Sequence, residues 1–185
     1  MSKTEIRITG FGGQGVIKSG YIIGKAAAIY DKRNATLNQS FGPEARGSAC
    51  SAQVIVSDEK ILYPYIRVPN IMIAMSQEGY TKYEPELDKQ GILLIDEDLV
   101  KPDRPRDKIK LYAIPATRIA EQLGRKIVQN IVMLGFFTAI TKVVKPESMR
   151  EAVKTSVPER TIELNLRAFD SGYEYGLKQL ETSDK

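Results

Sequence analysis

The sequence predicts an α/β protein: a mostly parallel central sheet with helices on its faces, an inserted antiparallel hairpin and a helical C-terminal part. Three observations support this class. Apolar strand-like runs alternate with helical stretches along the chain, and the C-terminal third has helical periodicity. The runs "NIMIAM" and "GILLID" are nearly continuous, which is typical of parallel strands covered on both faces. We expect one domain over residues 1–178, followed by a flexible tail at 179–185.

The first half of the chain is expected to alternate strands and helices. A strand is expected at Glu5–Thr9, where Ile6 and Ile8 share one face, and a helix follows at Val16–Tyr30. A short strand is expected at Ala35–Asn38. The segments "ACSAQVIVS" and "KILYPYI" flank the polar turn "SDEK", so together they predict the antiparallel β-hairpin.

The second half adds the parallel strands and the C-terminal helices. Between the two apolar runs, "SQEGYTKYEPEL" predicts a short helix, and "EDLVKPDRPRDK" predicts a surface loop before the last strand, "IKLYAI". The expected helices after it span Ala116–Leu123 and Ile127–Val144, and a further one begins at Pro146. The final helix carries an apolar stripe that faces either the core or another subunit: Ile162, Leu166, Phe169, Tyr173 and Leu177.

Composition restricts the chemistry that the chain can perform alone. Among its 185 residues there is no histidine and no tryptophan, and Cys50 is the only cysteine. The commonest general base and metal ligand is therefore missing, and a lone thiol forms neither an internal disulfide nor an iron–sulfur site. No acidic cluster has the pattern of a metal-binding loop. We expect a chain that binds a ligand or completes another subunit's site, with no catalytic residue and no metal of its own.

Charge and hydropathy also exclude classes of partner. The net charge of +4 is small, and no run of five like charges occurs, so neither nucleic acid nor a membrane surface is an expected partner. The N-terminal "MSKTE" does not resemble a signal peptide, and the longest apolar stretch is interrupted by polar residues. These features favour a cytoplasmic protein.

The segment "GFGGQGVIKSG" places Gly10, Gly12 and Gly15 at the spacing of a dinucleotide-binding loop. A loop that leads from a strand into a helix directs free amides at one point, where a phosphate can bind. The dinucleotide interpretation also needs an acidic residue at the end of the second strand, but Asp31 precedes that strand and Asn38 ends it. The alternatives are a different anion and a purely structural tight turn.

A second loop, "QSFGPEARGS", presents Glu44 and Arg46 between a Gly-Pro turn and the next strand. An arginine there could bind a carboxylate or phosphate with two parallel hydrogen bonds. The alternative is a solvated Glu–Arg pair, which contributes about 0–1 kcal/mol. Of the remaining candidates, we interpret Cys50 as a core residue and Asn130 as a polar group that ties its helix to a neighbouring loop.

Several of these segments together resemble the gamma subunit (domain III) of 2-oxoacid:ferredoxin oxidoreductases. The resemblance runs from Ile6 to about Leu177 and depends on "GFGGQGV", "QSFGPEARG", "VIVSDEKILYP", "PNIMIAMSQEGYTKY" and "QNIVMLG", in that order. The pair "SFGPEARG" and "AMSQEGYTKY" is most similar to members that act on 2-oxoglutarate. Pyruvate, branched-chain and aryl 2-oxoacids are the alternative substrates.

The resemblance implies a role within a larger enzyme. A 2-oxoacid, coenzyme A and oxidised ferredoxin give an acyl-CoA, carbon dioxide and reduced ferredoxin, and the isolated chain is expected to be inactive. Thiamine diphosphate, Mg and the iron–sulfur clusters are expected on the alpha and beta subunits, with or without a small ferredoxin-like delta subunit. The gamma subunit is associated with coenzyme A binding and with the active-site entrance.

Carried over to this sequence, the resemblance places two loops at that cleft. The residues expected there are Gly12, Gly13, Gln14 and Gly15 in the first loop, and Ser40, Gly42, Pro43, Glu44, Arg46 and Gly47 in the second. One hypothesis is that the helix N-terminus near Gln14, together with Arg46, binds an anionic part of coenzyme A or the thiamine site. Two others are that both loops only contact partner subunits, and that the chain is an autonomous NAD- or flavin-binding protein.

Overall fold

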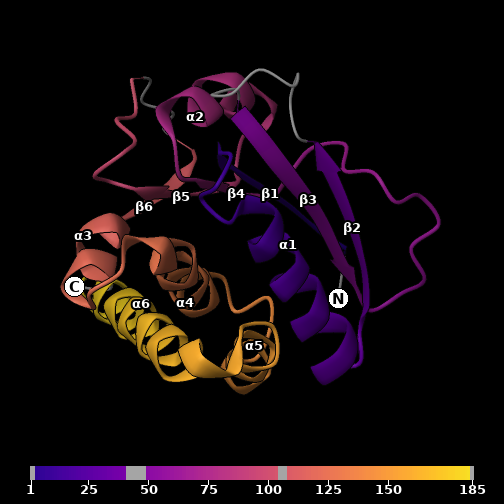
Figure 1. Ribbon diagram of the computed structural model, residues 1–185. Helices are drawn as coiled ribbons and strands as arrows, with labels where there is room; N and C mark the ends of the chain where they lie inside the picture. The colour runs from indigo at the N-terminus through magenta and orange to yellow at the C-terminus, as the bar shows by residue number, and fades with distance from the viewer. Residues whose placement is uncertain (1–2, 41–48, 104–107, 184–185) are drawn as a thin grey trace.

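The computed structural model describes residues 3–40, 49–103 and 108–183. Within these ranges six strands form one sheet in the order β2-β3-β1-β4-β5-β6, with helices on both faces (Figure 1). The strands are β1 (Thr4–Phe11), β2 (Asn34–Ser40), β3 (Ala49–Ser57), β4 (Ile71–Ala74), β5 (Ile92–Asp96) and β6 (Lys110–Ile114). The helices are α1 (Val16–Lys25), α2 (Gln77–Tyr83), α3 (Ala116–Gln122), α4 (Gln129–Thr141), α5 (Pro146–Lys154) and α6 (Ile162–Ser183).

The sheet is mixed, as its pattern predicts. β1, β4, β5 and β6 run parallel, and the two apolar runs "NIMIAM" and "GILLID" provide the buried strands β4 and β5. β3 runs antiparallel to β1 on one side and to β2 on the other. The predicted fold class is therefore confirmed.

The predicted pairing of the hairpin is wrong. The segment "KILYPYI" (60–66) forms no strand, and β3 pairs with β2 instead. Both edges of β3 are already taken by β1 and β2, so no edge remains for a third partner, and Pro64 has no amide to donate. The segment crosses the sheet instead: the Pro64 carbonyl accepts from the Asn38 side chain, and the Glu5 carboxylate accepts from the Arg67 and Val68 amides.

One face of the sheet carries the main core. Ile6 and Ile8 of β1 are fully buried under α1, which continues through a π-helical turn at Ala26–Tyr30, so the helix expected at Val16–Tyr30 is confirmed. α4 lies beside α1, between it and α6, and is buried on almost every side (Figure 1). The other face carries a smaller cluster, in which Tyr80 and Tyr83 of α2 pack on β4 and β5.

α6 packs against α4 mainly at glycines, and the apolar stripe predicted on α6 is only partly buried in this contact. A Cβ on Gly172 would lie 1.9 Å from the Val132 carbonyl oxygen, and one on Gly135 would lie 2.0 Å from that of Phe169. Phe169 is buried as expected, but Leu177 is 37% exposed, because the helix turns its glycines toward α4 to reach this distance. Residues 179–183, expected in the tail, continue α6, and Gln179 donates to the Ala113 carbonyl of β6.

Candidate functional site

The candidate site lies where the parallel strands end. In the sheet, β1 has β3 on one side and β4 on the other. After β1 the chain first builds β2 and β3 on one side and then crosses to β4 on the other, so the direction in which strands are added changes between β1 and β4. In open α/β sheets, ligands bind outside the carboxyl ends of the strands at such a switch point. The glycine loop, the start of α2 and the end of β5 all lie at this end of the sheet (Figure 1).

The glycine loop needs glycine for its backbone shape. Gly13 and Gly15 have φ angles of +91° and +74°, in the left-handed region that L side chains rarely adopt. A Cβ on Gly12 or Gly13 would meet nothing within 4 Å, so these two residues line open space. The loop therefore presents bare backbone at the N-terminus of α1, where the helix dipole favours an anion.

The Gln14 side chain, expected at the ligand, is used within the protein. Its Nε2 donates to the Met75 carbonyl at 2.8 Å, and its Oε1 accepts from the Phe11 amide at 2.6 Å. These bonds join the loop to the end of β4 and leave no room for a side chain at Gly10, whose Cβ would lie 2.5 Å from Gln14 Oε1. A ligand at this loop would therefore meet backbone amides rather than the Gln14 carboxamide.

Asn130 ties α4 to the same loop, as the sequence predicts. Its Nδ2 lies 3.3 Å from the Ser19 hydroxyl and 3.5 Å from the Gly15 carbonyl oxygen, and donates toward both. A Cβ on Gly15 would lie 2.5 Å from this nitrogen. Gly15 is thus required by its backbone conformation and by the approach of α4.

A cavity of about 290 Å³ opens beside the loop. It is lined by Gly13 and Gln14 on one side and by Lys126, Ile127 and Gln129, which lead into α4, on the other. Gln129 is 3% exposed, whereas Ile127 is 69% exposed at the mouth. The lining is mostly apolar, and its polar groups are the loop backbone near the α1 N-terminus, the Lys126 ammonium and the Gln129 amide. The helix N-terminus and the lysine are the two features that favour an anionic group.

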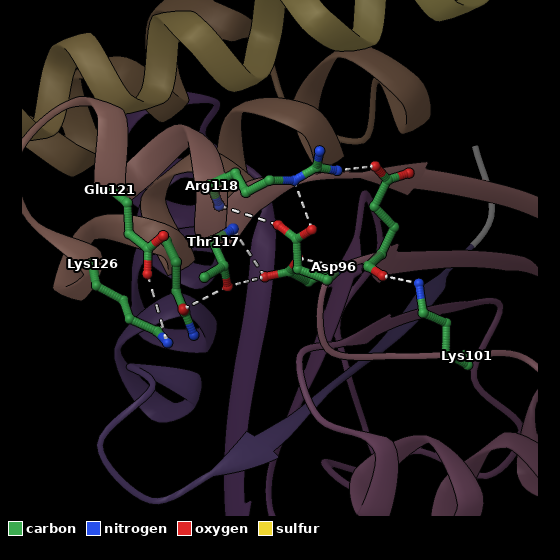
Figure 2. Close-up of polar contacts among 9 residues, drawn as sticks. Asp96, Lys101, Thr117, Arg118, Glu121 and Lys126 are labelled. Atoms are coloured by element: carbon green, nitrogen blue, oxygen red, sulfur yellow. Dashed lines mark hydrogen bonds and ion pairs between the residues drawn. The ribbon is translucent and has the colours of Figure 1, made fainter.

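A buried polar chain leads from this cavity to the end of β5 (Figure 2). Thr117 Oγ1 lies 3.1 Å from Gln129 Oε1 and 2.7 Å from Asp96 Oδ2. Asp96 is fully buried, and it also accepts from the amides of Thr117 at 3.1 Å and Asp98 at 3.2 Å. The carboxylate thereby holds the start of α3 against β5.

The contacts of the Thr117 hydroxyl with Asp96 and Gln129 need one more proton than the hydroxyl itself carries. One hydroxyl proton on Thr117 serves only one of the two oxygens, so either Asp96 is protonated or the Gln129 amide presents its nitrogen to Thr117. Burial raises the pKa of the Asp96 carboxyl, and the hydrogen bonds from Thr117 and Asp98 partly oppose this shift. Asp96 was not among the residues predicted from the sequence, although "GILLID" places an acidic residue at the end of an apolar parallel strand.

Exposed charges surround the buried chain (Figure 2). Arg118 pairs with Glu97 at 2.6 Å and with Asp98 at 2.7 Å, and Lys126 lies 3.9 Å from Glu121. Such exposed pairs contribute little stability, about 0–1 kcal/mol each. Lys126 is only weakly engaged, so its ammonium group remains available at the mouth of the cavity.

The second predicted loop lies outside the described residues. Gly42, Pro43, Glu44, Arg46 and Gly47 fall within residues 41–48, whose positions are not described. Its flanking residues are placed: Ser40 ends β2, and Ala49 begins β3 opposite Phe11 of β1. The second segment therefore leaves and re-enters the sheet at the same end as the glycine loop.

Two further candidates have structural roles. The Asp31 carboxylate accepts from the Lys145 amide at 3.0 Å and from the Ser148 hydroxyl at 2.6 Å, so it caps the start of α5 rather than facing the glycine loop. This geometry argues against the dinucleotide interpretation. Cys50 is 6% exposed in the core, and burial raises the pKa of its thiol, which keeps it unreactive.

The described residues form neither a metal-ligand cluster nor a membrane-spanning helix. Across the described ranges, no three His, Cys, Asp or Glu side chains gather as metal ligands would. No described helix is both long and apolar enough to cross a membrane.

The fold and this site define a class: an α/β protein that presents a glycine loop at a switch point of its sheet. Residues 5–175 match the family described as pyruvate ferredoxin/flavodoxin oxidoreductase. The chain is 49% identical over 174 residues to the 2-oxoglutarate synthase subunit KorC of Methanocaldococcus jannaschii, a match that covers 93% of each chain. This chain therefore belongs to the pyruvate ferredoxin/flavodoxin oxidoreductase family.

Solved structures show the same fold. The gamma subunit of the keto/oxoacid ferredoxin oxidoreductase of Geobacter sulfurreducens superposes with a TM-score of 0.84 at 41% identity, covering 95% of this chain and 99% of that one. A 2-oxoglutarate:ferredoxin oxidoreductase from Magnetococcus marinus, solved with 2-oxoglutarate, coenzyme A and succinyl-CoA bound, gives a TM-score of 0.87 at 23% identity. That match covers 97% of this chain but 32% of the other, so there the fold is part of a longer polypeptide.

Proposed function

We propose that this chain is the gamma subunit of a 2-oxoglutarate:ferredoxin oxidoreductase. The complex converts 2-oxoglutarate, coenzyme A and oxidised ferredoxin into succinyl-CoA, carbon dioxide and reduced ferredoxin. The observation that carries the proposal is the 49% identity to a 2-oxoglutarate synthase subunit over nearly the whole length of both chains. A pyruvate, branched-chain or aryl 2-oxoacid enzyme is the alternative.

The redox cofactors belong on other subunits in this proposal. The chain has no histidine, and its single cysteine is buried, so its residues do not fit an iron–sulfur cluster. Thiamine diphosphate, which would supply the electron sink for decarboxylation, is also assigned, with its Mg ion, to the alpha and beta subunits. Those subunits, with or without a ferredoxin-like delta subunit, and the external ferredoxin are the proposed partners, and the complex is proposed to be cytoplasmic.

The glycine loop is the part of this chain that fits an anionic portion of coenzyme A. The backbone of Gly13 and the neighbouring open position of Gly12 would face the ligand, while Lys126 and Gln129 line the opposite wall of the cavity. Arg46 would contribute from the second loop. In this role the chain binds and orients coenzyme A, and it moves no proton and no electron.

A second candidate role is a purely structural one, in which both loops contact only partner subunits. It is favoured by the internal use of the Gln14 and Asn130 side chains, which stiffens the loop without any ligand. Both roles require the same assembly, so kinetics and assembly must be measured separately.

The substrate is tested in the assembled enzyme, produced by co-expression of this chain with its alpha and beta partners. Ferredoxin reduction should depend on coenzyme A and be fastest with 2-oxoglutarate, and the isolated chain should be colourless and inactive. Faster reduction with pyruvate would reassign the substrate, and turnover by the isolated chain would overturn the proposal.

The loop is tested with Arg46→Ala in the same complex. A raised KM for coenzyme A with normal assembly supports ligand binding, whereas a lower yield of complex with an unchanged KM supports the structural role. Arg150→Ala is the matched control, because Arg150 pairs with Asp170 on the surface of α5 and α6, away from the loop. It should change neither value.

A further inference from the structure

Two helices begin at the cavity beside the glycine loop. α1 starts at Val16, directly after the loop, and α4 starts at Gln129, directly after a 3₁₀ turn at Lys126–Val128. Neither helix start has a side-chain cap. The positive ends of both helix dipoles therefore lie at the same space as the Lys126 ammonium group, and none of the five described residues that line this space is acidic.

Gln129 brings an unpartnered donor to this space. The residue lines the cavity although it is only 3% exposed, and its Oε1 lies 3.1 Å from the Thr117 hydroxyl. The carboxamide nitrogen at the other end of the side chain bonds to no described residue. A buried N–H group without a partner is unfavourable, so a ligand that accepts a hydrogen bond from this nitrogen would remove that cost.

A buried hydroxyl and a buried carboxyl group set the direction of the Gln129 carboxamide. A carboxamide presents its oxygen or its nitrogen according to the group that it meets on its closed side. Here that group is Thr117 Oγ1, which lies 2.7 Å from Asp96 Oδ2 (Figure 2). When the Asp96 carboxyl donates its proton to Thr117, the hydroxyl donates to Gln129 Oε1, and the carboxamide nitrogen is left for the cavity.

The surroundings of Asp96 favour its protonated form. Burial raises the pKa of the carboxyl, and the negative charge of Asp98 acts in the same direction, while the hydrogen bonds from Thr117 and from the Asp98 amide partly oppose the shift. Arg118, the cation of α3 at this end of the sheet, pairs with Asp98 and Glu97, and it forms no ion pair with Asp96 within the described ranges. The proton that the bond to Thr117 requires is therefore retained more readily than in an exposed aspartate.

We infer that Thr117 and Asp96 are positioning residues, which hold the Gln129 carboxamide with its nitrogen toward the cavity, where it donates a hydrogen bond to a phosphate group of the ligand. The two helix starts and Lys126 supply the positive potential for the same phosphate group. Thr117 and Asp96 act through Gln129 and do not touch the ligand. This inference rests on the proposed function, in which the ligand is coenzyme A.

Inorganic pyrophosphate tests the site in the full-length chain by itself. NMR titration of the nitrogen-labelled chain should shift the side-chain amide signals of Gln129 and the backbone amide signal of Gly13. The Gln129 shift should be lost in Thr117→Val, which replaces the hydroxyl by a methyl group, and should return in Thr117→Ser. An unmoved Gln129 signal in the wild type would overturn the inference, and so would an equal shift in Thr117→Val.

Kinetics of the assembled enzyme give the second test. Thr117→Val should raise the KM for coenzyme A about tenfold without changing kcat, and Gln129→Leu should raise it at least as much. Because Thr117 acts through Gln129, the variant with both substitutions should have the same KM as Gln129→Leu alone. Additive increases would overturn the inference, and so would an unchanged KM in Thr117→Val.

Thr138→Val is the matched control. Thr138 is also a buried threonine, but its hydroxyl donates to the Leu134 carbonyl within α4, so this substitution should leave the KM for coenzyme A unchanged. Thermal unfolding of each variant separates a folding defect from lost binding. A complex that reduces ferredoxin fastest with pyruvate would reassign the proposed substrate, but the pyrophosphate shifts and their dependence on Thr117 would remain.

Discussion

The two faces of the sheet are built on different principles. The face beneath α1 and α4 is apolar and close-packed, and its helices approach each other through glycines. The opposite face of β1 and β3 carries buried polar residues, among them Arg7, Thr9 and Ser51, under α2 and an irregular segment. The difference teaches that close apolar packing fixes the position of the glycine loop from one face, whereas the other face depends on buried polar side chains.

The largest expected effect is on the close-packed face. Gly135→Ala places a Cβ about 2.0 Å from the Phe169 carbonyl oxygen, so α4 and α6 must separate, and we expect a loss of about 3 kcal/mol in the free energy of unfolding. Urea unfolding of the isolated chain measures it. Gly24→Ala, in α1 with nothing within 4 Å, is the matched control and should be neutral or stabilising by about 0.5–1 kcal/mol. Equal effects would show that the helices are not held at contact.

A smaller loss in the free energy of unfolding is expected at Gly15, where the close-packed face meets the glycine loop. Gly15→Ala forces a side chain into a positive-φ position and against Asn130, with a cost of about 2 kcal/mol. Gly12→Ala has open space and should change stability by less than about 0.5 kcal/mol. Thermal unfolding of the pair compares them. A destabilisation by Gly12→Ala as large as that by Gly15→Ala would contradict the assigned loop geometry.

The substitution Asp96→Asn tests the buried carboxyl group at the end of β5. The amide retains one acceptor oxygen where the carboxyl has two, so we expect a loss of about 1–2 kcal/mol from amides left unbonded. Because burial raises the pKa of Asp96, the folded state binds its proton more tightly than the unfolded chain does. The wild type therefore loses stability from this group as pH rises from about 4 through the raised pKa.

The Asp96→Asn variant lacks this titration, so its disadvantage relative to the wild type should be largest near pH 4 and should shrink toward pH 8. Urea unfolding of both proteins across this range gives the difference. A disadvantage that grows with pH would show that the hydrogen bonds favour the carboxylate more than burial disfavours it.

The contrast between the faces also explains what the sequence could predict. Local patterns located β1, the glycine loop, the buried strands β4 and β5 and the buried helix α4, because each depends on its own neighbours in sequence. The predicted pairing of β3 was wrong because strand pairing depends on which edges of a strand are already occupied. The Asp96–Thr117–Gln129 chain was missed for a related reason: it forms only where three separate elements end side by side.

The smallest effect is expected on the polar face. Arg7 is 5% exposed beneath Tyr83; its Nη2 reaches Glu86 at 2.5 Å, but its Nε is buried without a partner among the described residues, and burial lowers the pKa of the guanidinium. A buried ion pair gains little net energy after desolvation, so Arg7→Met should change the free energy of unfolding by no more than about 1 kcal/mol.

Glu86→Gln is the matched comparison for Arg7→Met, because it leaves the guanidinium buried and removes its charged partner. It should therefore be the more destabilising of the two substitutions, although Glu86 is about half exposed and solvent screens part of the loss. Denaturant unfolding of both variants decides the order. If Arg7→Met proved as costly as Gly135→Ala, the polar face would be as tightly determined as the helical one, and the contrast between them would be lost.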